Sequence, residues 1–461
     1  MRVAHQQFHR VVALPLFLSL VLGSALAQKA QYTSFAAAEP VLASMPGEVP
    51  PALKSSGQLN AETWNKWVQG RDKEVRSRLD QGEENTLTNL LRLGVTYTKQ
   101  ERISYELLAK YGKDPKVNTL ADNRANDLIR ELSGTSLSPG MQEMRTFLES
   151  KGFNLKTPDG RQKVKAYMLA NLARWRDDVA RASQEVKVNK FQAFKDRGLS
   201  TDSDIYPDYT LEVHLKRMME KGLLKRGSVR RVGIVGPGLD FVNKKFGSDF
   251  YPPQTTQPFA VLDTLIRLGL SDPNSLEIYT YDISPRVNTH IEAARKEAAA
   301  GKPYVIQLLY APSEGWDGDY LAGLNKYWQT LGDKIGKPVT PISVPDSASG
   351  IKNRAVSVRP EFVLKIHPVD MNVVFQTVPL PPAQKLDLVI GTNIFLYYGD
   401  LEQSLARVNL AGMIKPGGFL LSNGALPGIA PTKLADSLET MLPITTVPLA
   451  SERMFSYERE R

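Results

Sequence analysis

The sequence has 461 residues, of which 42% are hydrophobic and 23% charged, and its net charge is +9. This composition is ordinary for a globular protein, and the length allows two or three domains with complete cores. There are no cysteines, which excludes disulfides, thiolate zinc sites and cysteine nucleophiles. The five histidines show no metal-ligand spacing, so we expect no metal site. The basic residues form no dense cluster with interleaved aromatic residues, so we expect no binding of nucleic acid.

The N-terminus has the three parts of a secretory signal. Arg2 and Arg10 precede an apolar run over residues 11–22, and Ala25 and Ala27 form a small-x-small cleavage site. Residues 1–27 are therefore predicted to be a signal peptide, and the mature protein is expected to be periplasmic or secreted. The alternative is an uncleaved anchor, although the run is short for a membrane span. No second span is expected, and without a signal the protein would be cytoplasmic.

The next part of the chain is predicted to be a tether and then a helical domain. Residues 28–57 mix alanine, proline and serine with little periodicity, which predicts a flexible tether. Asn60 can cap a helix, and apolar residues then recur at helical spacing. One such stripe is formed by Leu87, Leu90, Leu91 and Val95. We therefore expect an all-α N-terminal domain over residues 58–205.

The second domain is expected to start with a strand that runs into a glycine turn. Val232, Ile234 and Val235 suit a strand that is covered on both faces. Gly236 and Gly238 follow it, and glycine lets the backbone turn sharply and approach a ligand closely. In a doubly wound sheet, the carboxyl end of the first strand is where cofactors bind.

Helices and strands are then predicted to alternate. The order is a helix near residues 260–268, a strand at 276–282 ending in Asp282, and a helix at 287–300. Residues 301–370 are expected to be an insertion. Further strands are predicted at residues 372–377, 385–393 and 419–423, with a helix at 399–413 and a last hairpin from residues 444–449 and 454–458. This alternation predicts an α/β fold with a Rossmann-like, doubly wound and mostly parallel sheet, ending in an antiparallel hairpin.

Four motifs in this order resemble those of class I S-adenosylmethionine-dependent methyltransferases. They are the glycine turn at residues 232–238, the acid Asp282, the strand with its tip at 386–393, and the proline–glycine turn at 415–418. The resemblance spans about residues 210–461 and predicts a methyltransferase-like domain over residues 206–461. Residues 392–398 are also similar to a segment of chemotaxis-receptor-type methyltransferases.

The resemblance implies a site for S-adenosylmethionine. The implied cofactor-binding residues are Gly236, Gly238, Asp240, Asp282, Ile283, Thr392 and Asn393. The implied substrate pocket consists of Phe395, Tyr397 and Tyr398. No catalytic residue is indicated, and the methyl acceptor, a small molecule or a protein, is unknown.

Several alternatives stay open at the level of the sequence. Asp282 could cap the following helix, and Tyr397 and Tyr398 could be aromatic core. Ile234 stands where the family commonly has an acid, and Asp240 stands at the third glycine position. An exported, catalytically inactive binding module of the cell envelope is therefore the alternative function. A nucleotide- or NAD-dependent enzyme is disfavoured by the glycine pattern, and an α/β-hydrolase by the lack of a Gly-x-Ser-x-Gly elbow.

Overall fold

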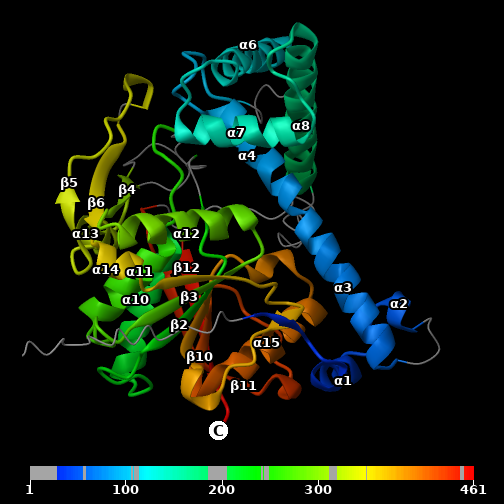
Figure 1. Cartoon of the computed structure of the whole chain (residues 1–461), viewed down its shortest axis with the longest axis vertical. Helices are drawn as coiled ribbons and strands as arrows, with labels where there is room; N and C mark the ends of the chain where they lie inside the picture. Colours follow the sequence, from blue (N-terminus) through cyan, green and yellow to red (C-terminus); the bar gives the residue numbers. More distant parts are fainter. Residues whose placement is uncertain are drawn as a thin grey trace, which may run out of the picture.

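The computed structural model describes residues 29–54, 59–104, 107, 114–184, 205–239, 242, 249–310, 319–348, 350–446 and 451–461. The predicted signal peptide therefore lies outside the described residues. The described part contains a large central sheet with helices on both faces, a smaller sheet and a group of N-terminal helices (Figure 1).

The central sheet has seven strands. They are β2 (Arg231–Val235), β3 (Glu277–Asp282), β7 (Ile366–Asp370), β9 (Leu386–Gly391), β10 (Ile414–Ser422), β11 (Leu434–Pro443) and β12 (Ser451–Arg459). Their order is β11-β12-β10-β9-β2-β3-β7, and only β12 runs against its neighbours. This is the Rossmann order 3-2-1-4-5-6 with one antiparallel strand inserted between the last two. The fold is thus mixed α/β with a mostly parallel sheet, consistent with a Rossmann-like methyltransferase fold.

Helices cover both faces of this sheet. They are α10 (Ile205–Glu220), α11 (Gln257–Arg267), α12 (Pro285–Ala299), α14 (Pro360–Val363) and α15 (Asp400–Met413). Alternate residues of the central strands enter different cores, as the two-residue period of a strand requires. In β2, Ile234 packs with α10 and α11, whereas Val235 packs on the face that α15 covers.

Part of the predicted insertion forms a sheet of its own. Strands β4 (Tyr304–Tyr310), β6 (Lys352–Val358) and β5 (Gly336–Val339) pair antiparallel in that order, next to helix α13 (Ala322–Thr330). The predicted insertion was too long, because β7 at its end belongs to the central sheet. The strand predicted at residues 372–377 is wrong. The Asn372 carbonyl accepts from the N–H groups of Phe375 and Gln376, which makes a turn, and only β8 (Gln376–Thr377) is extended.

The chain is helical before the central sheet. After β1 (Gln31–Tyr32) come α1 (Phe35–Ser44), α2 (Pro51–Lys54), α3 (Ala61–Ser77), α4 (Leu79–Leu93), α6 (Pro115–Leu132), α7 (Pro139–Ser150) and α8 (Pro158–Gln184). The Asn60 side chain accepts from the N–H groups at the start of α3, as predicted for a cap.

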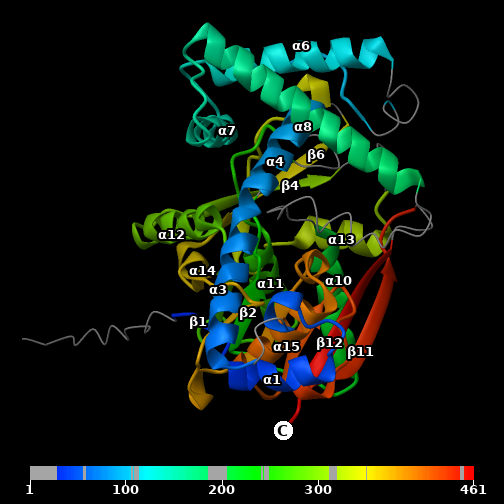
Figure 2. The ribbon, with the colours of Figure 1, turned by 90° about the vertical axis from the view of Figure 1, so that its right-hand side faces the viewer.

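These helices do not form one bundle. In place of the predicted flexible tether, β1 pairs with β8, and α1 packs on the face of the sheet that α15 covers. Helix α3 joins the same core through Trp64, whose indole N–H donates to the Thr33 carbonyl at 2.7 Å. Only α4, α6, α7 and α8 share a separate core. Figures 1 and 2 show α3 and α4 running on from each other, from the central sheet to this bundle.

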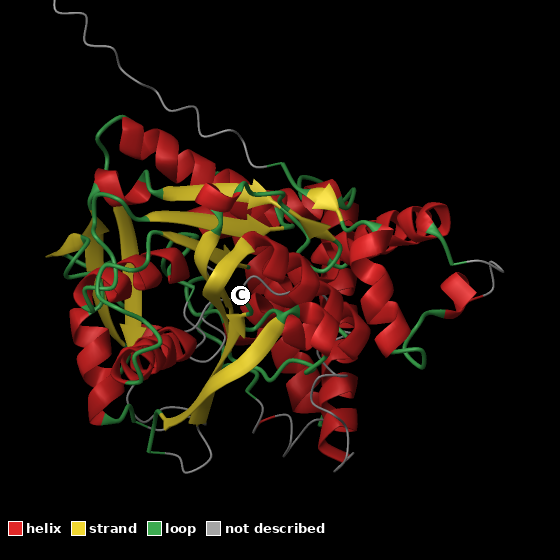
Figure 3. Ribbon diagram, turned by 90° about the horizontal axis from the view of Figure 1, so that it is seen from below, coloured by secondary structure: helices red, strands yellow, loops and turns green. Residues whose placement is uncertain are grey.

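The C-terminal strands β11 and β12 pair antiparallel along their whole length. The first of them begins earlier in the chain than predicted, at Leu434 instead of residue 444. Both lie at one end of the central sheet, and Figure 2 shows them side by side. Figure 3 shows the strands in yellow among the helices in red. No helix among the described residues is long and apolar enough to cross a membrane.

Candidate functional site

The strand order predicts a ligand-binding crevice at the carboxyl ends of β2 and β9. The chain leaves β2 for β3 on one side and later returns to β9 on the other, so the order reverses between these strands. Ligands of open α/β sheets bind at such a switch point. Of the predicted cofactor residues, the structure brings Gly236, Gly238, Asp282 and Asn393 to this edge of the sheet.

The glycine turn after β2 has a left-handed backbone. Gly236 and Gly238 have φ angles of 65° and 78°. The side chain of Ile394, which follows the tip of β9, lies against Gly236, and a Cβ on this glycine would collide with its Cδ1 atom. Because Gly236 has no Cβ, the Ile394 side chain can lie directly against its Cα. Asp240, the next predicted residue, lies outside the described residues.

Asp282 ends β3, and its carboxylate accepts hydrogen bonds from the backbone that follows it. Its Oδ1 atom accepts from the Ser284 N–H at 2.8 Å. The cap of α12 is Ser284, whose hydroxyl accepts from the Val287 N–H, so Asp282 is not the cap.

An arginine and two further carboxylates surround this strand tip. Asp370 ends β7, which lies beside β3, and its carboxylate is 2.7 Å from Arg76 Nη2 of α3. Arg76 also pairs with Asp72, one turn earlier on α3, at 3.2 Å, and donates to the Ile283 carbonyl at 3.3 Å. Asp72 and Asp370 therefore share one guanidinium at the tips of β3 and β7, and its charge also acts on Asp282.

Burial changes the protonation of Asp282. Burial, with a smaller contribution from Asp370, raises its pKa to about 7, although the N–H groups of Ser284 and Ile283 and the charge of Arg76 act in the opposite direction. Protein surrounds Asp282, but part of its surface remains accessible to solvent. Close to neutral pH, Asp282 is thus divided between its neutral and charged forms.

The tip of β9 is held in an unusual conformation. Asn393 has a φ of 59°, in the left-handed region that few residues other than glycine adopt. Its N–H donates to Asn423 Oδ1 at 2.8 Å, and Asn423 Nδ2 donates to Asn393 Oδ1 at 2.7 Å. Thr392 is buried and accepts from Gln257 Nε2 at 2.7 Å, so its hydroxyl is engaged within the protein.

The three residues predicted to line a substrate pocket are core residues in the structure. Phe395, Tyr397 and Tyr398 are all less than 10% exposed and belong to the core between the sheet, α3 and α15. The Phe395 ring lies against Gly391. Burial raises the pKa of Tyr398 well above its usual range, so this tyrosine is a neutral core residue at physiological pH.

The helical bundle is fastened to the loops at the crevice. Val242, which follows the glycine turn, is buried in the core of the bundle. Asp249 accepts from the N–H groups of Val95 and Thr96, at 2.9 and 3.2 Å. Arg286, near the start of α12, pairs with Glu83 of α4 and Glu143 of α7. The bundle therefore lies on the side of the sheet where the crevice opens (Figure 1).

The prediction from sequence missed Asp72, Arg76 and Asp370. Asp370 is an acid at a strand end, like Asp282, and would have been found with β7 placed correctly. No group of three or more histidine, aspartate or glutamate side chains among the described residues is arranged to hold a metal ion.

Comparison with known proteins gives distant structural likenesses only. No family model and no curated protein matches the chain. The N-methyltransferase NodS from Bradyrhizobium japonicum WM9 is similar at 8% identity, over 55% of this chain and 97% of that chain, with a TM-score of 0.26. Magnesium protoporphyrin IX methyltransferase (ChlM) from Synechocystis PCC 6803 is similar at 12% identity, over 61% and 97% of the two chains, with a TM-score of 0.26. A TehB-like methyltransferase from Corynebacterium glutamicum has 9% identity, over 63% and 99%, and a TM-score of 0.24. Likenesses this distant bear on neither ligand nor activity, so the functional argument depends on the crevice.

Proposed function

We propose that the chain is a methyltransferase that binds S-adenosylmethionine in the crevice at the tips of β2, β3 and β9. The proposal is supported mainly by the acidic group around Asp282 at a switch point of the sheet. Fold alone does not fix an activity, so the chemistry of these side chains carries the argument.

The charge of the crevice favours this cofactor over a dinucleotide. S-adenosylmethionine carries a sulfonium, an ammonium and one carboxylate, and is therefore a net cation. The pyrophosphate of a dinucleotide is an anion and prefers a helix N-terminus or basic side chains. Three carboxylates around Arg76 offer the opposite field.

The residues divide into three roles. Asp282 accepts hydrogen bonds from the ribose hydroxyls, as an acid at a strand tip does in dinucleotide enzymes. Gly238 lets the backbone approach the cofactor. Asn393, at the tip of β9, forms the part of the site nearest the methyl acceptor. The bound cofactor supplies an already activated methyl group, so the protein contributes chiefly by positioning the reactants. The helical bundle closes the side from which an acceptor would enter.

The first test is titration calorimetry on the full chain with S-adenosylmethionine, S-adenosylhomocysteine and NAD⁺. We expect saturable heat from the first two and none from NAD⁺. No heat from either adenosyl compound, with a cooperatively folded protein, would remove the proposal. Heat from NAD⁺ alone would replace the methyltransferase with a nucleotide-dependent enzyme.

A second candidate is an exported, catalytically inactive binding module. It is favoured by Ile394, whose side chain occupies the space beside Gly236 where a cofactor would come close. The predicted signal peptide favours it too, because S-adenosylmethionine is made in the cytosol. Cell fractionation and sequencing of the mature N-terminus distinguish the two candidates. A cytosolic protein that starts at Met1 would count against the exported binding module and would favour the methyltransferase.

A further inference from the structure

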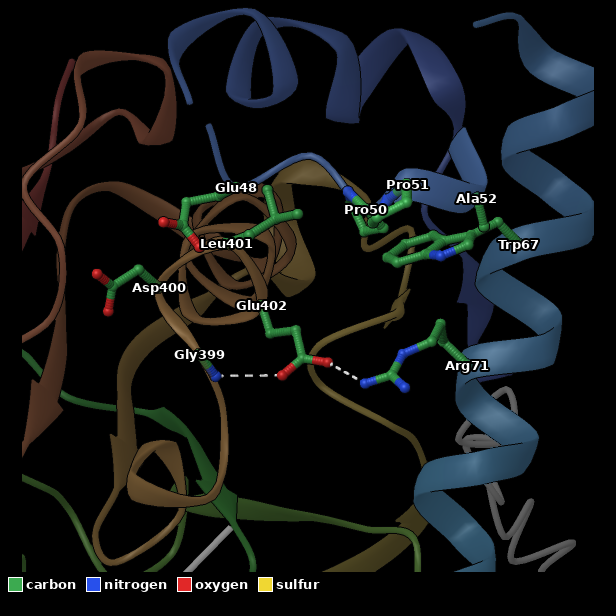
Figure 4. Close-up of a pocket in the computed structure, with 10 residues that line it drawn as sticks. All are labelled: Glu48, Pro50, Pro51, Ala52, Trp67, Arg71, Gly399, Asp400, Leu401 and Glu402. Carbon is green, nitrogen blue, oxygen red and sulfur yellow. Dashed lines mark hydrogen bonds and ion pairs between the residues drawn. The ribbon is translucent and has the colours of Figure 1, made fainter. Parts of the chain in front are cut away.

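A cavity of about 340 Å³ lies away from the strand tips, between α2, α3 and the start of α15 (Figure 4). Its apolar walls come from the Trp67 indole, the rings of Pro50 and Pro51, and Leu401. Leu401 is buried, and Trp67 packs edge-on against Phe375, so this wall is anchored in the core. The volume suits a small ligand and is near the lower end of the range for such sites.

Among the described residues that line the cavity, the one cation, Arg71, is already neutralised. Arg71 donates to Glu402 at 2.7 Å and also pairs with Glu74. Glu402 in turn accepts from the Gly399 N–H at 3.2 Å and completes the cap of α15. Since its guanidinium is shared between two carboxylates, Arg71 offers little attraction to an anionic ligand.

Two carboxylates in the cavity lining have no such partner. Glu48 and Asp400 are exposed, and neither side chain has an ion pair or a hydrogen bond within the part of the chain that the structure describes. Figure 4 shows both on one side of the cavity, across from Trp67 and Arg71. The lining therefore has an apolar half and a half with two unneutralised negative charges.

We propose that this cavity binds a small alkylammonium ion, with its hydrocarbon part against Trp67 and the proline rings and its ammonium group at Glu48 and Asp400. Burial of the hydrocarbon part and attraction by two carboxylates act together on such a ligand. A neutral molecule of the same shape would gain only the first of these, and an anion would be repelled. The site does not depend on the proposed methyltransferase activity.

The test uses the full chain labelled with 5-fluorotryptophan and observed by ¹⁹F NMR. The five tryptophans give five signals, and Trp67→Phe identifies the one from Trp67. We expect butylammonium chloride to shift this signal saturably, with a Kd on the order of 1 mM. The neutral analogue 1-butanol, at the same concentrations, should shift the signal much less, because it gains only the burial of its hydrocarbon part.

Two variants locate the ammonium group. The double variant Glu48→Gln/Asp400→Asn should raise the Kd for butylammonium at least fivefold. Glu62→Gln, which removes an exposed acid elsewhere on α3, should leave the Kd unchanged. An unmoved Trp67 signal, an equal shift with 1-butanol, or an unchanged Kd in the double variant would each overturn the proposal. Far-UV circular dichroism and melting curves confirm that the variants are folded.

Discussion

Replacing Asp282 by asparagine should separate a binding role from a structural one. Asparagine keeps the shape and the acceptor for the Ser284 N–H but removes the buried charge. The shift in pKa from 3.8 to about 7 corresponds to at most roughly 4 kcal/mol, at 1.36 kcal/mol per pKa unit. Because Asp282 is partly accessible to solvent, we expect the variant to gain about 1–3 kcal/mol of stability at pH 8.

The expected gain in stability follows from the upward shift of the Asp282 pKa. Below pH 4, Asp282 is protonated in both the folded and the unfolded state and costs nothing. Between pH 4 and 7 the unfolded state ionises first, so the wild-type protein loses stability as pH rises, and above pH 7 the loss is complete. Asp370, Arg76 and Tyr398 are the charged or titratable groups that act on Asp282, and all three remain in the variant.

Urea unfolding of both proteins at pH 5 and pH 8 measures this effect, and calorimetry with S-adenosylmethionine measures binding. We expect Asp282→Asn to be more stable at pH 8 and to bind more weakly, by about 1–3 kcal/mol, the range for hydrogen bonds to a charged group. Gain of stability with loss of function is typical of functional sites. A variant that is less stable at pH 8 and binds as well as the wild type would refute the reasoning and make Asp282 a structural residue.

Three further substitutions probe the surroundings of the crevice. Arg76→Met should destabilise the fold by about 2 kcal/mol in urea unfolding, because Asp72 is left buried without its cation. Arg286→Met should increase hydrogen exchange in α4 and α7, because it breaks both ion pairs between α12 and the bundle. Gly236→Ala should lower stability by about 1–2 kcal/mol in thermal unfolding, because of its positive φ, and adding Ile394→Ala should recover only the part that comes from the collision.

A control variant and the contradicting outcomes show whether each effect has the stated cause. Arg130→Met removes an ion pair in which the arginine side chain is 74% exposed, and should change stability by less than about 0.5 kcal/mol. A comparable loss in Arg130→Met and Arg76→Met would contradict the role given to Asp72. Unchanged exchange in Arg286→Met would show that other contacts hold the bundle. Full recovery by Ile394→Ala would mean that backbone strain at Gly236 is negligible.

The sequence predicted the central strands well and the edge strand badly, for a physical reason. β2 and β9 are largely buried on both faces and read as apolar runs, and β3 alternates and ends in an acid, which makes these strands recognisable. β7 contains His367 and Pro368, and proline normally argues against a strand. It is tolerated there because β7 is at the edge of the sheet and pairs only with β3.

From the sequence, only those residues of the candidate site that lie at the ends of the central strands could be predicted. The acid at the end of β3 was recognisable from position, whereas Arg76 comes from a helix far away in the chain. One signal was available: Trp64, Val68, Asp72 and Val75 form the buried stripe of α3, so a charged residue stands at a core position. Buried charges need partners, which here are the Asn372 amide, the Tyr32 hydroxyl and Arg76. The partners themselves follow from packing, which a single sequence does not reveal.

Helix α3 connects the two sites that we propose. Trp67 and Arg71 line the cavity beside α15, and Asp72 and Arg76 reach the tips of β3 and β7. Both sets of side chains are therefore fixed by one helix, which the Trp64 indole anchors in the core of the sheet. A fragment that begins at the predicted domain boundary near residue 205 would lose these side chains together with one wall of the core. The N-terminal segment is thus part of the functional unit, and binding experiments are meaningful only with the chain that contains it.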